Sequence, residues 1–432
     1  MNNYVFTGAQ ILDGPATDIA IQDGKIVALG EDAKDFSGPR IDAGGLVALP
    51  GLVDLHCHLR QPGMDAAETV YTGTRAAAAG GYTCVYAMAN TNPVGDNALV
   101  IEKVLDLGEA AGFVEVRPIG AVSKGLEGKS LSAMGSMAAS RAKVRVFSDD
   151  GKCVSDSALM RRALEYAKGL DAVIAQHAQE PTLTATAQMN EGVVSGELGL
   201  AGWPAAAEES IIARDILLAK HLDARVHVCH LSTAGSVELV RWAKAQGIKI
   251  TAEATPHHLS LSEELARTFD PRYKVNPPLR TQADIEAVRD GLADGTIDIV
   301  GTDHAPHPAA TKECPWDEAA FGMTGLETAL PIIIKTMVQT GRMNWADVAR
   351  VLSYTPARIG SNPNQGLPIA VGNPANLALV DPTVVRVVNP DEQYTKSRNC
   401  PYIGMELPGQ VMYTAYRGKL TVKAGKVQED QQ

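Results

Sequence analysis

Short apolar runs alternate with alanine-rich, amphipathic stretches from residue 51 onward. Mostly apolar runs are typical of buried parallel strands, and apolar positions three or four residues apart are typical of helices. The pattern predicts strands at 51–58, 82–88, 114–121, 143–148, 172–177, 224–230, 248–254 and 297–302. It predicts helices at 66–79, 97–111, 131–140, 155–168, 206–221, 233–246, 282–294, 324–340 and 344–357.

Eight units of a strand followed by a helix are what a (β/α)₈ barrel requires. We therefore expect an α/β protein in which residues 51–361 form a TIM barrel that carries the chemistry. An open, doubly wound sheet is the competing topology. It is disfavoured because no G-x-G-x-x-G motif follows the first predicted strand.

The two ends of the chain have a different pattern of apolar and polar residues. Residues 1–50 and 362–432 mix apolar and polar positions at short spacing, as in strands joined by tight turns, and contain no histidine. Asp23-Gly24 is a hairpin signal within the first segment. Because chain termini often lie close together, we expect both segments to form one small discontinuous β domain, a β-sandwich flanking the barrel.

The composition argues against some classes of binding partner. A net charge of −11 argues against a general nucleic-acid binder, which needs basic surfaces. The apolar runs fall short of the roughly 18 residues that suggest a membrane span, and no signal peptide is visible at the N-terminus. Six scattered cysteines without a C-x-x-C pair favour reduced thiols and a cytoplasmic location. We expect a small-molecule substrate, no nucleic acid and no membrane.

His56 and His58 end the first predicted strand, in Asp54-Leu-His-Cys-His-Leu-Arg60. Side chains two apart on a strand share a face, so these imidazoles form a chelating pair for a divalent metal. Arg60 has the same parity if the extended geometry persists. Taken alone, the pair also fits a strand with two partly exposed histidines at a subunit contact.

Other polar residues fall at the ends of the predicted strands, which is where a barrel gathers its active site. They are His56, His58, Asn90, Asp149, Asp150, His177, His230, His257, His258 and Asp303. Imidazoles and carboxylates suit Zn²⁺ or a similar ion. Three ligands, His56, His58 and Asp303, leave a position open for water. His177 and His230 make a second metal feasible, with one of the two acids 149 and 150 as a bridge.

Several of these residues have a structural interpretation as well. His177 alone is more typical of a satisfied core histidine, and the acids at 149 and 150 alone read as a turn. We expect structural roles for His221, His227 and His304, and we interpret Cys57 and Cys229 as small core residues on the opposite strand face. The placement of so many polar residues at strand ends nevertheless favours a metal site.

The chain resembles the amidohydrolase superfamily and, within it, bacterial-type dihydroorotases. The motifs that carry the resemblance run in family order: Asp54-Leu-His-Cys-His-Leu-Arg-Gln-Pro-Gly63, Met88-Ala-Asn90, Phe147-Ser-Asp-Asp-Gly151, His227-Val-Cys-His-Leu-Ser-Thr233, Thr251-Ala-Glu-Ala-Thr-Pro-His-His258, Asn276-Pro-Pro-Leu-Arg280 and Gly301-Thr-Asp-His-Ala-Pro-His307. The resemblance implies a barrel of the metal-dependent hydrolase type. It also implies the reversible cyclisation of N-carbamoyl-L-aspartate to L-dihydroorotate, a step of pyrimidine biosynthesis.

The resemblance also implies residue roles. One or two zinc ions would be held by His56, His58, His177, His230, Asp150 and Asp303, with Asp150 as the bridge and Asp303 as the general acid and base. Related members bridge with a carboxylated lysine, but Lys143 lies too early in its strand to reach the mouth. The substrate would be bound by His58, Arg60, Asn90, Asn276, His307, Phe321 and Gly322. The planar fork of an arginine suits the substrate carboxylate.

The resemblance leaves other readings open. Gln61 stands where the family usually has an acid, and the segment 309–320 is long enough to act as a lid. A hydantoinase or allantoinase shares the histidines, and some relatives are non-catalytic partners of aspartate carbamoyltransferase. We expect a catalytically active homo-oligomer, a dimer, and we keep an association with aspartate carbamoyltransferase as a further option.

Overall fold

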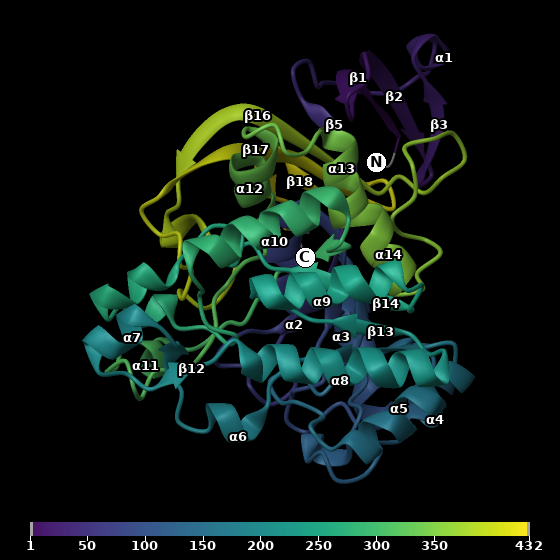
Figure 1. Cartoon of the computed structure of the whole chain (residues 1–432). Helices are drawn as coiled ribbons and strands as arrows, with labels where there is room; N and C mark the ends of the chain where they lie inside the picture. Colours follow the sequence, from purple (N-terminus) through teal and green to yellow (C-terminus); the bar gives the residue numbers. More distant parts are fainter. Residues whose placement is uncertain (1–2, 430–432) are drawn as a thin grey trace.

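Within residues 3–429, which the computed structural model describes, strands from both ends of the chain pair into one nine-stranded sheet. Its purple and yellow strands lie together at the top of Figure 1. The strands are β1 (Tyr4–Ile11), β2 (Ala16–Gln22), β3 (Lys25–Leu29), β4 (Arg40–Asp42), β5 (Val47–Pro50), β16 (Leu377–Val387), β17 (Glu406–Tyr416), β18 (Lys419–Lys423) and β19 (Lys426–Val427). Their order is β19-β18-β17-β16-β5-β1-β2-β3, and β4 pairs with β1.

Strand β5 joins the two terminal segments. It runs antiparallel to β16, with Leu377 opposite Pro50, and parallel to β1. Apolar side chains from both segments, among them Phe6, Ile19 and Leu379, pack into one buried cluster. The expected pairing of the two ends is therefore present, in the form of a single continuous sheet.

The part of the chain between β5 and β16 that the structure describes contains eight central strands, which pair in parallel. They are β6 (Leu52–Cys57), β7 (Tyr82–Ala87), β8 (Glu115–Pro118), β9 (Val146–Phe147), β10 (Val173–Gln176), β13 (Val226–Val228), β14 (Ile250–Ala254) and β15 (Ile299–Val300). They form the sheets β6-β7-β8 and β15-β14-β13-β10-β9. Parallel bridges from Gly120 to Phe147 and from Cys57 to His304 connect the two sheets at both edges.

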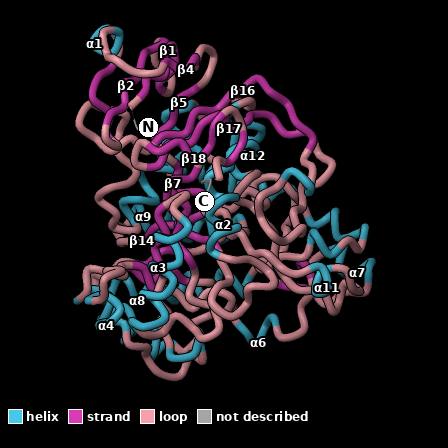
Figure 2. The backbone as a smooth tube through the Cα atoms, turned by 180° about the vertical axis from the view of Figure 1, so that it is seen from behind, coloured by secondary structure: helices cyan, strands magenta, loops and turns pink. Residues whose placement is uncertain are grey.

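Helices follow the central strands, and Figure 2 shows α2, α3, α8 and α9 around them. The longer helical segments are α2 (Val70–Ala79), α3 (Ala98–Ala111), α4 (Met134–Ala139), α5 (Ser157–Gly169), α8 (Ala206–Leu222), α9 (Ala234–Ala245), α10 (Gln282–Asp294), α12 (Ala329–Ile333), α13 (Trp345–Ala349) and α14 (Thr355–Ile359). The π-helical turns η4 (Ile334–Val338) and η5 (Arg350–Tyr354) continue α12 and α13. Each predicted strand and helix therefore has a counterpart, usually a shorter one.

Local sequence sets the ends of these helices. In α3, the Asn97 side chain accepts hydrogen bonds from the amides of Leu99 and Val100, which satisfies otherwise unpaired donors of the first turn. The helix ends at Gly112, whose φ of 70° is left-handed and therefore favours glycine. Side-chain caps also begin α2, α5, α9, α10 and α13.

Short elements decorate the loops, and the hydrophobic pattern does not predict them. They are α1 (Glu31–Lys34), η1 (Lys124–Leu126), α6 (Pro181–Thr184), β11 (Met189–Asn190), α7 (Val193–Leu198), β12 (Gly202–Trp203), η2 (Glu263–Thr268), η3 (Pro271–Tyr273), α11 (Ala309–Lys312) and η6 (Pro390–Glu392). Two to six residues are too few to display a helix or strand period.

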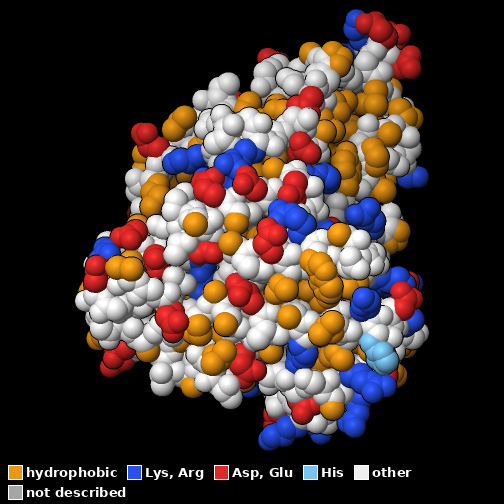
Figure 3. Space-filling model, viewed as in Figure 1, with side chains coloured by type: hydrophobic (Ala, Val, Ile, Leu, Met, Phe, Trp, Pro, Cys, Tyr) orange, Lys and Arg blue, Asp and Glu red, His pale blue; other side chains and the backbone are white. Residues whose placement is uncertain are grey.

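The surface carries charges of both signs. Acidic and basic side chains are interspersed over most of the face in Figure 3. Among the described helices, none has both the length and the apolar character needed to cross a membrane.

Candidate metal centre and active site

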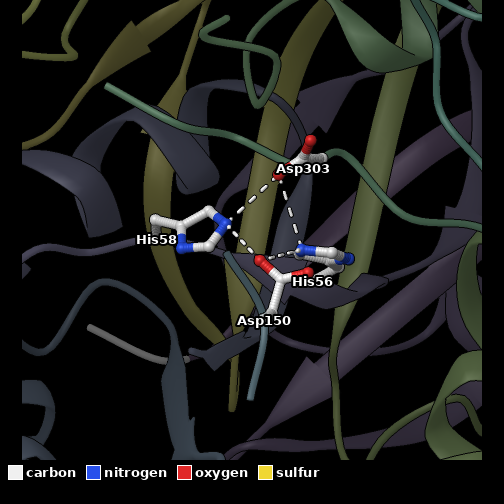
Figure 4. Close-up of side chains that lie close together, drawn as sticks. All are labelled: His56, His58, Asp150 and Asp303. Atoms are coloured by element: carbon white, nitrogen blue, oxygen red, sulfur yellow. Dashed lines mark hydrogen bonds and ion pairs between the residues drawn. The ribbon is translucent and has the colours of Figure 1, made fainter. Parts of the chain in front are cut away.

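Four buried side chains converge where the first, fourth and eighth central strands end (Figure 4). His58 Nε2 lies 3.2 Å from Asp150 Oδ2 and 3.2 Å from Asp303 Oδ1. His56 Nε2 lies 3.4 Å from the same two oxygens. The four residues are between 0% and 5% exposed. The structure thus brings the two histidines of the H-x-H motif together with two acids from distant parts of the chain.

Asp150 also faces a second group of ligand atoms. Its Oδ1 lies 3.3 Å from His177 Nδ1 and 3.3 Å from His230 Nε2. His177 follows β10 and His230 follows β13, and their facing nitrogens are 2.7 Å apart. Asp150 therefore presents one carboxylate oxygen to each group, which is the arrangement of a bridging ligand.

The donor atoms fit a divalent cation. In each group the candidate ligand atoms lie within 4.8 Å of one another, and imidazole nitrogen with carboxylate oxygen is a ligand set that zinc and similar ions accept. His56 Nε2 is buried without a hydrogen-bond partner, although it points at the two carboxylates. A buried polar atom without a partner is costly, and a cation between these groups would satisfy it.

The charges of the centre favour ionised carboxylates. Burial by itself opposes the ionisation of Asp150 and Asp303. The facing imidazoles outweigh burial, so that the pKa of Asp303 falls to about 2 and the pKa of Asp150 lies well below its usual value. Both side chains are consequently anionic at neutral pH, as metal ligands must be.

Glu253 holds the ligands from behind, and the sequence analysis did not identify it. This carboxylate on β14 accepts hydrogen bonds from His56 Nδ1, from His227 Nε2 at 3.2 Å and from the amide of His230 at 3.1 Å. The bond from Nδ1 leaves Nε2 of His56 for the centre, which is how outer carboxylates orient metal-binding histidines. The structural role expected for His227 thus includes fixing this carboxylate. An acid inside an otherwise apolar strand was the available signal.

Asp54 ties the first strand to the last beneath the centre. It accepts hydrogen bonds from the amide and hydroxyl of Thr302, at 3.0 and 2.5 Å, and from the amide of His56 at 3.2 Å. Its burial is complete and raises its pKa to about 7. The residue therefore fixes the distance between the H-x-H strand and Asp303, and it too was missed.

The two neighbouring acids have different surroundings. Asp149 accepts from the amides of Val122 and Ser123 at 2.8 and 2.9 Å, so it anchors the loop after β8. Asp150 turns into the ligand groups instead. Lys143 is exposed, which leaves Asp150 as the residue between the two groups.

The backbone at Arg60 differs from the extended geometry considered for it. Strand β6 ends at Cys57, and Arg60 has a φ of 61°, so the extended geometry does not persist and parity says nothing about its direction. Its Nε donates to the carbonyl of Pro306 at 3.1 Å, and its Nη2 lies 3.4 Å from His307 Nε2. Burial lowers the pKa of Arg60 to about 10, so it remains a cation at neutral pH.

The other residues expected to bind substrate surround the centre, some of them bonded to its ligands. Asn90 Oδ1 accepts from His58 Nδ1 at 2.9 Å. Asn276 Nδ2 donates to Gln179 Oε1 at 3.1 Å, and the same oxygen accepts from His177 Nε2 at 2.8 Å. Asn276 Oδ1 is buried and has no hydrogen-bond partner, so an acceptor is available there for a ligand.

His307, Phe321 and Gly322 form one contact beside Arg60. The Nε2–H of His307 donates to the carbonyl of Phe321 at 2.8 Å. A Cβ at position 322 would meet His307 Nε2 at 2.7 Å, so only glycine fits this close approach. The loop after β15 is thereby held against His307, which matches a residue that assists substrate binding in the family.

The remaining candidates lie around this centre with other partners. His258 bonds Thr255 Oγ1 and the Pro277 carbonyl, and His304 bonds Glu68 and the amide of Gly325. His257 is buried with its Nε2 unpartnered. Cys229 is buried as expected, but its sulfur lies within 4.8 Å of ligand atoms of His56 and Glu253, which strand parity did not predict.

Three residues of the centre have left-handed backbone conformations. Arg60, His230 and Asp303 have φ values of 61°, 31° and 44°. Side-chain-bearing residues adopt this region at a cost, and such residues cluster at functional sites. Each of the three follows a central strand, so the turn out of the strand aims the side chain.

Comparisons with known proteins agree with this geometry. Residues 45–236 match a family model described as Dihydro-orotase-like. The chain is 62% identical over 99% of its length to a dihydroorotase of Leifsonia xyli, of which it covers 97%. It is 58% identical over 99% of its length to one of Streptomyces coelicolor, covering 100% of it. A dihydroorotase of Mycobacterium tuberculosis is 52% identical over 96% of the chain, with 97% of the relative covered.

Solved structures share the fold. The L-hydantoinase (dihydropyrimidinase) of Arthrobacter aurescens superimposes with a TM-score of 0.88 at 25% identity, covering 99% of this chain and 98% of that one. The dihydropyrimidinase of Brevibacillus agri superimposes with a TM-score of 0.84 at 23% identity, covering 98% and 96%. The likeness extends over both the central strands and the terminal sheet.

Proposed function

The chain belongs to the dihydroorotase family, and from this premise we propose that it interconverts N-carbamoyl-L-aspartate and L-dihydroorotate in pyrimidine biosynthesis. It is a hydrolase acting on cyclic amides. One observation carries the proposal for this chain: Asp150 lies between two groups of buried histidines, and Arg60 stands beside them. That pairing joins a metal centre to a cation suited to a substrate carboxylate.

We further propose that the central strands form one closed (β/α)₈ barrel of the metal-dependent hydrolase type, over residues 51–361. The sequential parallel pairing supports it, as does the bridge from Cys57 back to His304, which connects the first strand to the segment after the last. Residues 1–50 and 362–432 would form the flanking β domain, built on the nine-stranded sheet; residues 1–2 and 430–432 lie outside the described part of the chain.

The proposed metal is zinc, as one or two ions per chain. His56, His58 and Asp303 would hold one ion, His177 and His230 the other, and Asp150 would bridge them. A bound cation supplies Lewis acidity, polarising the cyclic amide and making water easier to deprotonate. The outer bonds from Glu253 and Gln179 keep two of the imidazoles aimed at the centre.

Asp303 would carry the proton. Its low pKa keeps it deprotonated at neutral pH, the state that can accept a proton from the attacking water, and its position beside His58 places it at the centre. In ring opening, it passes that proton to the ring nitrogen as the amide bond breaks. In ring closure, it accepts a proton from the carbamoyl nitrogen and returns it to the departing oxygen.

Arg60 would bind the substrate carboxylate, because a guanidinium pairs with a carboxylate through two parallel hydrogen bonds. Asn90, which bonds His58, and His307, which lies 3.4 Å from Arg60, would assist in binding the same carboxylate. Asn276, Phe321 and Gly322 would line the pyrimidine ring. His58 would contact both the metal and the substrate.

The structural likeness to hydantoinases makes a hydantoin the alternative substrate. A carboxylate next to the ring distinguishes dihydroorotate from a simple hydantoin, so Arg60 is the residue that separates the two. The retained ligand set argues against a non-catalytic partner of aspartate carbamoyltransferase. A dimer, an association with that enzyme and a cytoplasmic location stay predictions.

A substrate panel tests the function. Purified protein should open L-dihydroorotate, followed by ultraviolet absorbance, with kcat/KM at least about 100-fold above that for hydantoin or allantoin, since one buried charge pair contributes that much discrimination. A preference for an uncharged cyclic amide would reject the assignment in favour of a hydantoinase.

A further inference from the structure

Two buried lysines beside the proposed ring-binding residues contact carbonyl groups instead of acids. Lys312 is 5% exposed and Lys274 is 1% exposed. Neither makes an ion pair with an acidic residue of the described chain. The Nζ of Lys312 donates to three carbonyl oxygens at 3.1, 2.9 and 3.0 Å, those of Lys274, Ala320 and Gly322. A buried ammonium is costly unless it is fully hydrogen-bonded.

The contacts of Lys312 match its chemistry. A protonated lysine has three N–H donors and no acceptor, and three carbonyls receive them. The carbonyls come from two separate parts of the chain, the segment before Asn276 and the loop after β15. Lys312 thus closes the loop onto that segment.

Lys274 completes the connection from the opposite direction. Its Nζ donates to the carbonyl of Asp317 at 3.3 Å and lies 4.5 Å from the centre of the Phe321 ring. Its own carbonyl accepts from the amide of Gly322 at 3.0 Å as well as from Lys312. The backbone on either side of Phe321 is therefore fixed to the loop segment that leads to Asn276.

We propose that Lys312 is a positioning residue for substrate binding, whose ammonium holds Phe321 and Gly322 in register with Asn276. The inference rests on the proposed function, because it takes these three residues as the lining of the pyrimidine ring. The three hydrogen bonds of Lys312 all go to backbone carbonyls. Its loss would loosen the ring contacts while leaving the ligand groups around Asp150 in place.

The contact is also sensitive to protons. Burial, followed by the like charge of Lys274, lowers the pKa of Lys312 to about 7, while Asp270 and Cys314 act in the opposite direction. The imidazole of His307 faces it as well, and its own pKa is lowered to about 3, so it is neutral. Because this buried environment favours the neutral amine over the ammonium, the closed loop should become more stable relative to an open one as the pH rises past about 7.

Kinetics of Lys312→Met test the proposal. Lys129→Met is the matched control, because the side chain of Lys129 is 79% exposed and pairs with the exposed Glu127. We expect the KM for L-dihydroorotate to rise about tenfold or more, the equivalent of one lost hydrogen bond, with kcat within about threefold of wild type and metal content unchanged. Hydrogen exchange of residues 309–322 should become faster in the variant. Lys312→Arg, which keeps a permanent charge and several donors, should recover part of the affinity.

The wild type supplies a measurement that needs no variant. Protection of the amides of residues 309–322 against hydrogen exchange, corrected for their intrinsic exchange rates, should increase between pH 7 and pH 9. A wild-type KM in Lys312→Met, or protection of residues 309–322 that falls over this pH range in the wild type, would overturn the inference alone. A wild type that does not turn over dihydroorotate would overturn the proposed function and the substrate role of Lys312 with it.

Discussion

The proposed metal side and the proposed ring-binding side of the site are held together by different means. Around the candidate metal ligands, buried carboxylates on strands, Asp54 and Glu253, bond directly to His56 and its neighbours. Around Asn276, Phe321 and Gly322, loops are joined through backbone carbonyls and two buried lysines. The first arrangement is anchored in the sheet, and the second depends on one loop keeping its place.

This difference separates chemistry from recognition. Strand-borne carboxylates give ligand positions that move little, as a metal centre requires. A loop held by ammonium groups can open and close at lower cost, because few strand hydrogen bonds need to break. Substitutions on the metal side should therefore change kcat or metal content, and substitutions on the loop side should change KM.

The largest effect is expected from Asp303→Asn. The amide cannot take the proton, so kcat should fall by about 10² to 10⁴-fold, the usual contribution of a general acid and base. Metal content should stay near that of wild type because five other ligands remain. Steady-state kinetics give kcat, and metal analysis of the same sample gives the metal content. The control is Asp106→Asn, because Asp106 is exposed and pairs with Arg141. A near-normal rate would remove the proton role.

Arg60→Met should produce the next largest effect. Loss of a charged hydrogen-bonding partner should lower kcat/KM for L-dihydroorotate about 100-fold, mostly through KM, and leave an uncharged cyclic amide unaffected. Steady-state kinetics on both substrates measure the split. The exposed Arg161→Met, whose partner is Glu165, serves as the comparison. Equal losses on the two substrates would mean that Arg60 has a structural task instead.

Glu253→Gln should weaken metal binding about 10- to 100-fold, the usual cost of losing an outer partner of a ligand histidine. The amide no longer fixes His56 Nδ1 with a negative charge. Competition with a chelator of known affinity measures the change, and Glu264→Gln, an exposed partner of Arg267, is the control. Unchanged retention of the metal would show that the strands alone position the ligands.

The sequence predicts the residues of the proposed metal side better than the packing of the proposed ring-binding side. His56, His58, His230 and Asp303 were visible because a polar residue that ends an apolar strand stands out. Glu253 and Asp54 were not, since their partners lie on other strands and no spacing records such contacts. Strand parity did not apply to Arg60, because β6 ends at Cys57, three residues before it. Lys312 and Lys274 belong to loop packing, which has no period to read.

The smallest expected effect is on stability, through Lys312. Its pKa of about 7 in the folded chain lies below the 10.5 of a free lysine. The folded state therefore binds fewer protons between pH 7 and 10.5, so the free energy of unfolding should increase with pH across that window. The increase should be absent in Lys312→Met, as monitored by denaturant unfolding at several pH values. Identical pH profiles of the two proteins would contradict the burial of this charge.

The claim that the His/Asp cluster binds a catalytic metal is tested most directly by removing that metal from the wild type and returning it. Ring opening of L-dihydroorotate should disappear as the metal content falls, and it should return in proportion to the zinc bound when Zn²⁺ is added back. Full activity in protein shown by analysis to be free of metal would contradict the account.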